Sequence, residues 1–356
     1  MRDDQSILEV LDAAGKRRAE RRSFLKAAGA ATAAAGGLSL LAACGNDDNG
    51  GSTPVSNPPT SPTPTAVTDP DILNFALQLE YLEAQFYSYA VFGTGLVASL
   101  QTGVGTQGAV ATSGTGAGQP RAVNFAGETL IGQYAREIAA DEISHVSFLR
   151  TALGSAAVAQ PAINISGDAT GAFTTVARAA GVVSATGTFD PYASPDNFLL
   201  GAFIFEDVGV TAYKGASPLL TSKVFLEAAA GILAAEAYHA GLVRTILYAR
   251  GQTTPSLITT AGQVSDLRDL VDGVPADDAV RGIGGDDDQG IASQTLTVNG
   301  VSGTASNLVP TNSNGLAYSR TPGQVLNIVY GSRSAVSGGG FFPQGLNGRF
   351  TIANAS

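Results

Sequence analysis

The chain has 356 residues, a formal net charge of −10 and a single cysteine, Cys44. An acidic chain repels phosphate backbones, so we expect no nucleic acid as a partner. A single cysteine excludes an intramolecular disulfide, and stability must therefore come from a buried core, which a chain of this length can form.

The first 44 residues follow the order of an export signal. A basic stretch that includes Arg21 and Arg22 precedes an uncharged run of Ala, Gly and Leu, which ends in the lipobox-like Leu-Ala-Ala-Cys44. The run has about 17 residues, which is short for a membrane-spanning helix. We therefore expect residues 1–44 to be a twin-arginine signal with a lipid on Cys44; an uncut membrane anchor is the alternative.

This signal predicts two partners, the twin-arginine export machinery and the membrane, which the chain would reach through its lipid anchor. It also predicts a periplasmic or other extracytoplasmic location. Residues 45–68 consist mostly of Gly, Asn, Asp, Ser, Thr and Pro, and this composition is typical of a flexible linker.

Four segments with helical periodicity follow the linker, over about residues 69–91, 124–153, 194–215 and 222–250. The first has Pro70 in its opening turn, and the third opens at Ser194-Pro195. The third and fourth are apolar on nearly all sides, which indicates helices buried inside a larger body.

The connections between these helices are uneven. Residues 93–119 form a long first loop, residues 154–192 form a long linkage with room for extended pieces, and the last link is short. Two helical hairpins joined by a long crossover match the topology of a ferritin-like bundle. We therefore predict an all-α fold whose four-helix bundle covers residues 69–250.

Residues 251–356 contain no glutamate and many Asn and Gly residues, and we predict an irregular appendage packed on the bundle. Short helices are expected at residues 264–272 and 321–329. The run Asp286-Asp287-Asp288 is interpreted as a solvated acidic loop, with a cation site as the alternative.

Both histidines of the chain have a glutamate three residues earlier, in Glu142-Ile-Ser-His145 and Glu236-Ala-Tyr-His239. The chain has only ten glutamates, so chance rarely produces this pattern. Positions i and i+3 share a helix face, so each pair points a carboxylate and an imidazole the same way. Two such pairs, with one glutamate from each of two further helices, make up a carboxylate-bridged di-iron or di-manganese site.

An internal repeat indicates the two further glutamates. The spacing Glu80-x6-Tyr87 in the first helix returns as Glu206-x6-Tyr213 in the third. Glu83 is the alternative in the first helix, but it has no tyrosine seven residues later. The repeat therefore favours Glu80.

The predicted site holds two ions, with iron favoured over manganese. Two divalent cations balance four buried carboxylates, and imidazole nitrogen suits iron, manganese or zinc. Two glutamates would bridge the ions, and a Glu and a His would complete each end. The predicted ligands are Glu142 and Glu236 as bridges, Glu80 with His145, and Glu206 with His239.

Neighbouring residues are predicted to support the ligands. Tyr87 and Tyr213 are expected to donate hydrogen bonds to ligand carboxylates, with a redox role as the alternative. Asp141 is placed to orient a ligand histidine. Arg150 and Arg244, which follow the two histidines at equal spacing, are interpreted as last-turn cations that favour the helix dipole.

The helices resemble the ferritin-like domain of desiccation-related proteins, bacterial exported members included. The similarity is carried by residues 74–87, 137–153, 198–213 and 227–247, with tail stretches at 314–322 and 340–343. It covers residues 68–348 and implies a four-helix ferritin-like fold with a di-metal centre. It implies no particular reaction, because a fold alone does not supply one.

Three candidate functions therefore remain. The first is a redox enzyme that acts on oxygen, peroxide or a metal ion in envelope stress, in a catalase-like, peroxidase-like or ferroxidase-like way. The second is a non-enzymatic stress scaffold with a structural metal or none, and a metal buffer is a third, weaker candidate. The oligomeric state is not predicted.

Overall fold

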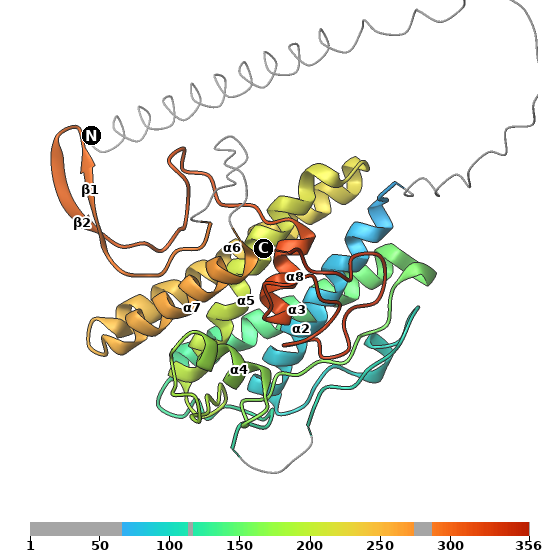
Figure 1. The fold of residues 1–356 in the computed structure, drawn as a ribbon, viewed down its shortest axis with the longest axis horizontal. Helices are drawn as coiled ribbons and strands as arrows, with labels where there is room; N and C mark the ends of the chain where they lie inside the picture. Colours follow the sequence, from blue (N-terminus) through green and yellow to red (C-terminus); the bar gives the residue numbers. More distant parts are fainter. Residues whose placement is uncertain (1–65, 113–116, 274–286, 356) are drawn as a thin grey trace, which may run out of the picture. The chain divides into compact units, whose positions relative to one another are not determined.

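The computed structural model describes residues 66–112, 117–273 and 287–355. The predicted signal and nearly all of the linker, with Arg21, Arg22 and Cys44, lie outside these ranges. The described residues form a mainly helical body (Figure 1). A search of this part of the chain finds no helix with the length and hydropathy that a membrane span requires.

Four long helices form two hairpins. Helix α2 (Asp69–Phe92) packs along α3 (Thr129–Leu153), and α5 (Pro195–Ala216) packs along α6 (Lys223–Gly251). The crossover between the hairpins contains a helix, α4 (Ala172–Ala179). The prediction of an all-α ferritin-like bundle is confirmed. Three short 3-10 turns accompany the bundle: η1 (Ala98–Leu100), η2 (Gly154–Ala156) and η3 (Ser217–Leu219).

Local sequence explains where the helices begin. Thr68 forms a capping box with Asp71 before α2, and the Ser194 and Ser222 hydroxyls accept hydrogen bonds from the N–H groups of the third residues of α5 and α6. Helix α3 begins five residues later than its predicted start at 124. The reason is Gly127, whose φ of 85° cannot continue a right-handed helix.

The central helices are α2 and α5. They bury 18 of 24 and 16 of 22 residues, whereas α6 buries only nine of 29. The prediction that the third and fourth helices are both buried on all sides is therefore wrong for the fourth. The apolar residues of α6 are largely Ala and Gly, and such small residues occur equally well on an outer surface.

The C-terminal residues form further elements. Helix α7 (Ser256–Asp272) begins eight residues before its predicted start and packs on α5, α6 and α8 (Pro322–Tyr330). Strands β1 (Gln294–Val298) and β2 (Val301–Ala305) form an antiparallel hairpin that was not predicted. Its two-residue turn, Asn299-Gly300, has positive φ at both positions, which is a strong hairpin signal.

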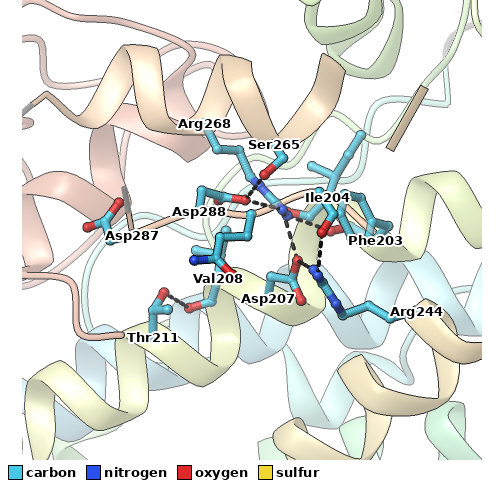
Figure 2. Close-up of polar contacts among 12 residues, drawn as sticks. Phe203, Ile204, Asp207, Val208, Thr211, Arg244, Ser265, Arg268, Asp287 and Asp288 are labelled. Carbon is cyan, nitrogen blue, oxygen red and sulfur yellow. Dashed lines mark hydrogen bonds and ion pairs between the residues drawn. The ribbon is translucent and has the colours of Figure 1, made fainter. Parts of the chain in front are cut away.

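The prediction of a solvated loop is wrong for the described part of the acidic run, Asp287 and Asp288. Asp286 lies outside the described residues, but Asp287 and Asp288 are only 2% and 7% exposed. Both carboxylates lie 3.1 Å from Arg320 Nη2, and Asp288 also lies 2.7 Å from Arg268 (Figure 2). The error arose because the arginines that neutralise these carboxylates are distant in sequence.

Arg244 belongs to the same buried network. The prediction that Arg244 lies in the last turn of α6 is wrong. Arg244 is fully buried, and its Nη1 lies 2.7 Å from Asp207 Oδ2 on α5 (Figure 2). The last-turn cation is Arg250, which pairs with Asp196 at 2.5 Å and with Glu128 at 3.0 Å. These pairs tie α6 to α5 and to the start of α3.

Candidate metal centre

Each of the four bundle helices contributes to one buried cluster of acidic and imidazole side chains. Helices α2 and α5 contribute one glutamate each, and α3 and α6 contribute one Glu-x-x-His pair each. The four carboxylates are at most 1% exposed. Members of the cluster are Glu80, Glu142, His145, Glu206, Glu236 and His239.

The cluster divides into two groups. Within each group, the ligand atoms all lie within 4.8 Å of one another. Both groups contain Glu142 and Glu236, so these two carboxylates stand between them. One group is completed by Glu80 and His145, and the other by Glu206 and His239. Glu83 belongs to neither group. The structure thus brings together all six predicted ligands, and binding of ions by them stays a prediction.

In both histidines, Nδ1 faces the carboxylates. His145 Nδ1 lies 3.2 Å from Glu80 Oε2 and 3.4 Å from Glu142 Oε2. His239 Nδ1 lies 3.0 Å from Glu142 Oε1 and 3.6 Å from Glu206 Oε2. Each imidazole therefore shares a small volume with one terminal and one shared carboxylate.

Several of these buried atoms make no hydrogen bond of acceptable geometry with any described residue, although imidazole and carboxylate atoms lie 3.0–3.7 Å apart. They are both carboxylate oxygens of Glu142 and of Glu236, Oε2 of Glu206, and Nδ1 of His239. An unpaired buried polar group costs about 1–3 kcal/mol, and a charged one costs more. Six such atoms that converge on one volume fit a pair of divalent cations, which would use them as ligands.

The pKa values of the cluster residues indicate which protons bound metal ions would displace. Burial raises the pKa of Glu80 to about 7 and holds the pKa of Glu236 well above its usual range. Burial also opposes the ionisation of Glu142, but the two neighbouring imidazoles outweigh it and lower the pKa to about 2. Burial disfavours charged histidines, yet the carboxylates raise the pKa of His145 to about 10 and of His239 to about 12. Protons and cations therefore compete for the same atoms.

Each of the two tyrosines donates a hydrogen bond to a glutamate of the other hairpin. Tyr87 on α2 donates a hydrogen bond to Glu206 Oε1 on α5, and Tyr213 on α5 donates one to Glu80 Oε1 on α2. Burial and the adjacent carboxylates hold the pKa of both phenols well above the usual range, so they remain neutral donors. Each hydroxyl holds one oxygen of its glutamate and leaves Oε2 facing a histidine.

The two halves of the centre differ in their outer contacts. Asp141 Oδ2 lies 3.1 Å from His239 Nε2, so Asp141 contacts the histidine of the other hairpin. The corresponding residue of the repeat, Ala235, cannot form such a contact with His145. The side chain of His145 is 12% exposed and that of His239 only 4%. The His145 half is therefore nearer to solvent.

Glu83, the alternative ligand in the first helix, is not in either ligand group but is buried near them. This residue is 5% exposed, and burial followed by the charges of neighbouring glutamates holds its pKa well above the usual range. A Cβ atom on Gly209 would lie 3.4 Å from Glu83 Oε1 and 3.1 Å from Glu236 Cδ. Glu83 and the cluster residue Glu236 therefore both lie close to the bare backbone of Gly209.

The sequence predicts only one role for Arg150, that of a last-turn cation that favours the helix dipole. It lies in the last turn of α3 as predicted, and it also donates hydrogen bonds at 2.5 Å to the Tyr81 hydroxyl and to the Thr102 carbonyl. It thereby fastens the long loop after α2 to the bundle beside the site.

Comparisons with known proteins agree with this geometry. A family model described as "Ferritin-like domain" matches residues 68–249. The desiccation-related protein PCC13-62 of Craterostigma plantagineum is 30% identical over 288 residues, which cover 79% of this chain and 84% of that protein. The ferritin-like catalase Nec2 of Nesocodon mauritianus is 27% identical over 291 residues, with the same coverage of each chain. No solved structure matches the chain. The chain therefore belongs to the ferritin-like family of desiccation-related proteins.

Proposed function

We propose that this protein is a di-metal oxidoreductase that disproportionates hydrogen peroxide, with two iron or manganese ions in the buried cluster. The observation that carries the proposal is the pair of ligand groups that share Glu142 and Glu236. Two adjacent ions can exchange two electrons with one substrate, as the conversion of 2 H₂O₂ to 2 H₂O and O₂ requires. The similarity to a protein named as a catalase favours peroxide over other substrates.

The chain's own residues prepare this chemistry. When bound, the ions would accept two electrons from one peroxide and return them to the next. Glu142 and Glu236 would bridge the ions and fix their separation. Asp141 Oδ2, 3.1 Å from His239 Nε2, would accept a hydrogen bond from that nitrogen and so leave Nδ1, once deprotonated, to bind an ion. The phenols of Tyr87 and Tyr213 restrict two carboxylates to one orientation each.

The electrostatics of the site favour redox-active divalent ions. When ionised, the four buried carboxylates would carry four negative charges, which two divalent cations would neutralise. The donor set of carboxylate and imidazole suits iron and manganese, although zinc and copper compete for the same atoms. Iron remains the favoured ion in this proposal.

Oxygen evolution tests the proposal. The purified protein is loaded anaerobically with Fe(II) or Mn(II), and O₂ release from added peroxide is followed with an electrode. We expect release by the parent and its loss in a Glu142→Gln/Glu236→Gln double variant. Glu137→Gln is the matched control, because Glu137 lies exposed on α3, outside the cluster. A loaded parent that holds two ions and releases no oxygen would refute the proposed reaction.

The location is a separate proposal. Residues 1–44 would direct export by the twin-arginine route, with a lipid at Cys44 as the anchor. Folding before export would load the ions in the cytoplasm, away from competing zinc and copper. Lysine substitutions of both Arg21 and Arg22 test this idea. Retention of the variant in the cytoplasm is expected, and unchanged export would contradict it.

A non-enzymatic stress scaffold is the second candidate, and the similarity to a protein named as desiccation-related favours it. In this case the buried cluster would hold a structural ion such as zinc. A tightly held, redox-inert metal in protein from the native host, with no oxygen release after reloading, would establish it.

A further inference from the structure

Two cavities with largely apolar linings adjoin each other, and one of them contacts Glu83 and Gly209 beside the metal centre. The inner cavity measures about 20 Å³ and lies between α2, α5 and α8, and the outer one measures about 70 Å³ and lies between α4, α5, α7 and α8. A cavity needs about 10–15 Å³ to hold one water-sized molecule. Both cavities therefore have room for a diatomic gas.

The cavities share part of their walls. Four side chains line both of them: Ile204, Ile328, Val329 and Phe341. All four are apolar, so a molecule that moves from one cavity to the other passes only hydrocarbon. The shared side chains thus form the partition between two sections of one passage.

The inner end of the passage reaches the cluster. Glu83 and Gly209 line the inner cavity, and Glu83 is the single polar side chain in its lining. Gly209 has no side chain to close the wall, and a Cβ there would collide with the carboxylate of Glu236. Gly209 therefore adjoins both the inner cavity and the carboxylate of Glu236, a predicted bridging ligand.

The outer end of the passage opens to solvent. Thr175 and Ala179 on α4 and Gly331 after α8 line the outer cavity and are exposed. Arg268 also lines it, but its terminal nitrogens are turned away to Asp207, Asp288 and the Phe203 carbonyl (Figure 2). The charge of this arginine is therefore paired with carboxylates that do not line the cavity.

We propose that the two cavities form a passage for dioxygen between the surface and the metal centre. An apolar lining admits a small apolar molecule, whereas peroxide would lose its hydrogen bonds to water there. Peroxide would instead reach the more exposed His145 half. The choice of dioxygen rests on the proposed function, because oxygen is the product of peroxide disproportionation.

Xenon tests the passage without any metal. Apolar cavities bind xenon, so crystals of the metal-free protein under xenon pressure should show density in the outer cavity. Val329→Phe should abolish this density, because Val329 lines both cavities. Val325→Phe is the matched control: Val325 lies one turn earlier on α8, is also buried and lines neither cavity. It should retain the xenon.

Kinetics test the same variants with metal bound. Reoxidation of the reduced protein by dissolved O₂ should slow in Val329→Phe and not in Val325→Phe, while oxidation by peroxide stays unchanged in both. Absence of xenon from the parent, or equal O₂ rates in the two variants, would overturn the proposal. Because the xenon measurement needs no metal or turnover, it can succeed even if the protein does not disproportionate peroxide.

Discussion

Loading the metal-free protein with two divalent ions should release protons from the histidines. The carboxylates around them outweigh burial and raise the pKa of His145 to about 10 and of His239 to about 12. Both imidazoles are therefore protonated at pH 8. Each Nδ1 must give up its proton before its lone pair can bind an ion.

The expected magnitude is two protons from the imidazoles for each pair of ions bound at pH 8. Glu236, whose pKa burial holds well above its usual range, adds to the release at any pH below that pKa. Release of two protons raises the overall binding constant about a hundredfold for each pH unit. This slope should persist until the pH approaches about 10, where His145 of the metal-free protein loses its proton unaided.

Calorimetry measures this release directly. The protein is titrated anaerobically with Mn(II) at pH 8 in two buffers of different ionisation enthalpy, and the difference in observed heat gives the number of protons. The Glu137→Gln variant, altered on the exposed face of α3, should behave as the parent does. Tight binding of two ions with no proton release would refute the reasoning, because it would mean that the imidazoles are neutral or are not ligands.

Three further changes follow from the contacts. Tyr213→Phe leaves Glu80 Oε1 without its donor, so thermal unfolding of the metal-free protein should show a loss of about 1–3 kcal/mol; an unchanged transition would count against the hydrogen bond. Asp141→Asn removes the charged acceptor at His239 Nε2 and should weaken metal affinity about 10–100-fold in a chelator competition, and equal affinity would mean that the contact does not orient the ring. Burial raises the pKa of Asp287 from 3.8 to about 7, so between pH 3.8 and about pH 7 the folded protein binds a proton that the unfolded chain does not. The free energy of unfolding therefore falls as the pH rises through this range. Asp287→Asn should reduce the loss of melting temperature between pH 5 and pH 8, and an equal loss in parent and variant would contradict this origin.

The cluster was predictable because its signal is local and repeated. Each Glu-x-x-His pair needs only one helix to place both side chains, and the repeat of Glu80-x6-Tyr87 selects the facing glutamates. The bundle followed from the same periodicity and from capping residues such as Ser194. Hydrogen bonds from the tyrosines to the opposite hairpin agree with the expected pairing.

The network around Arg320 was not predictable in this way. Its partners Asp272, Asp287 and Asp288 come from α7 and from the segment before β1, and Arg320 lies just before α8. Nothing in the local sequence indicates that these charges meet in the interior. A run of aspartates has the composition of a solvated loop, and only tertiary packing reverses that interpretation.

The degree to which whole helices are buried was also not predictable from the sequence. Helix α2 carries buried polar side chains such as Gln78 and Gln85, which reach the Asn347 carbonyl and the Gln160 side chain across long sequence separations. A polar helix face is expected to meet solvent, so periodicity alone underestimates its burial. Helix α6 shows the opposite error, since its many alanines suggest a core helix.

Metal analysis of the protein purified from its native host, beside a Glu142→Ala/Glu236→Ala double variant, tests the central claim most directly. The two ligand groups predict about two equivalents of iron or manganese in the parent, because two ions would share these bridging carboxylates. The double variant should lose both ions. Absence of metal from both proteins, with equal thermal stability, would contradict the di-metal centre and leave a ferritin-like scaffold.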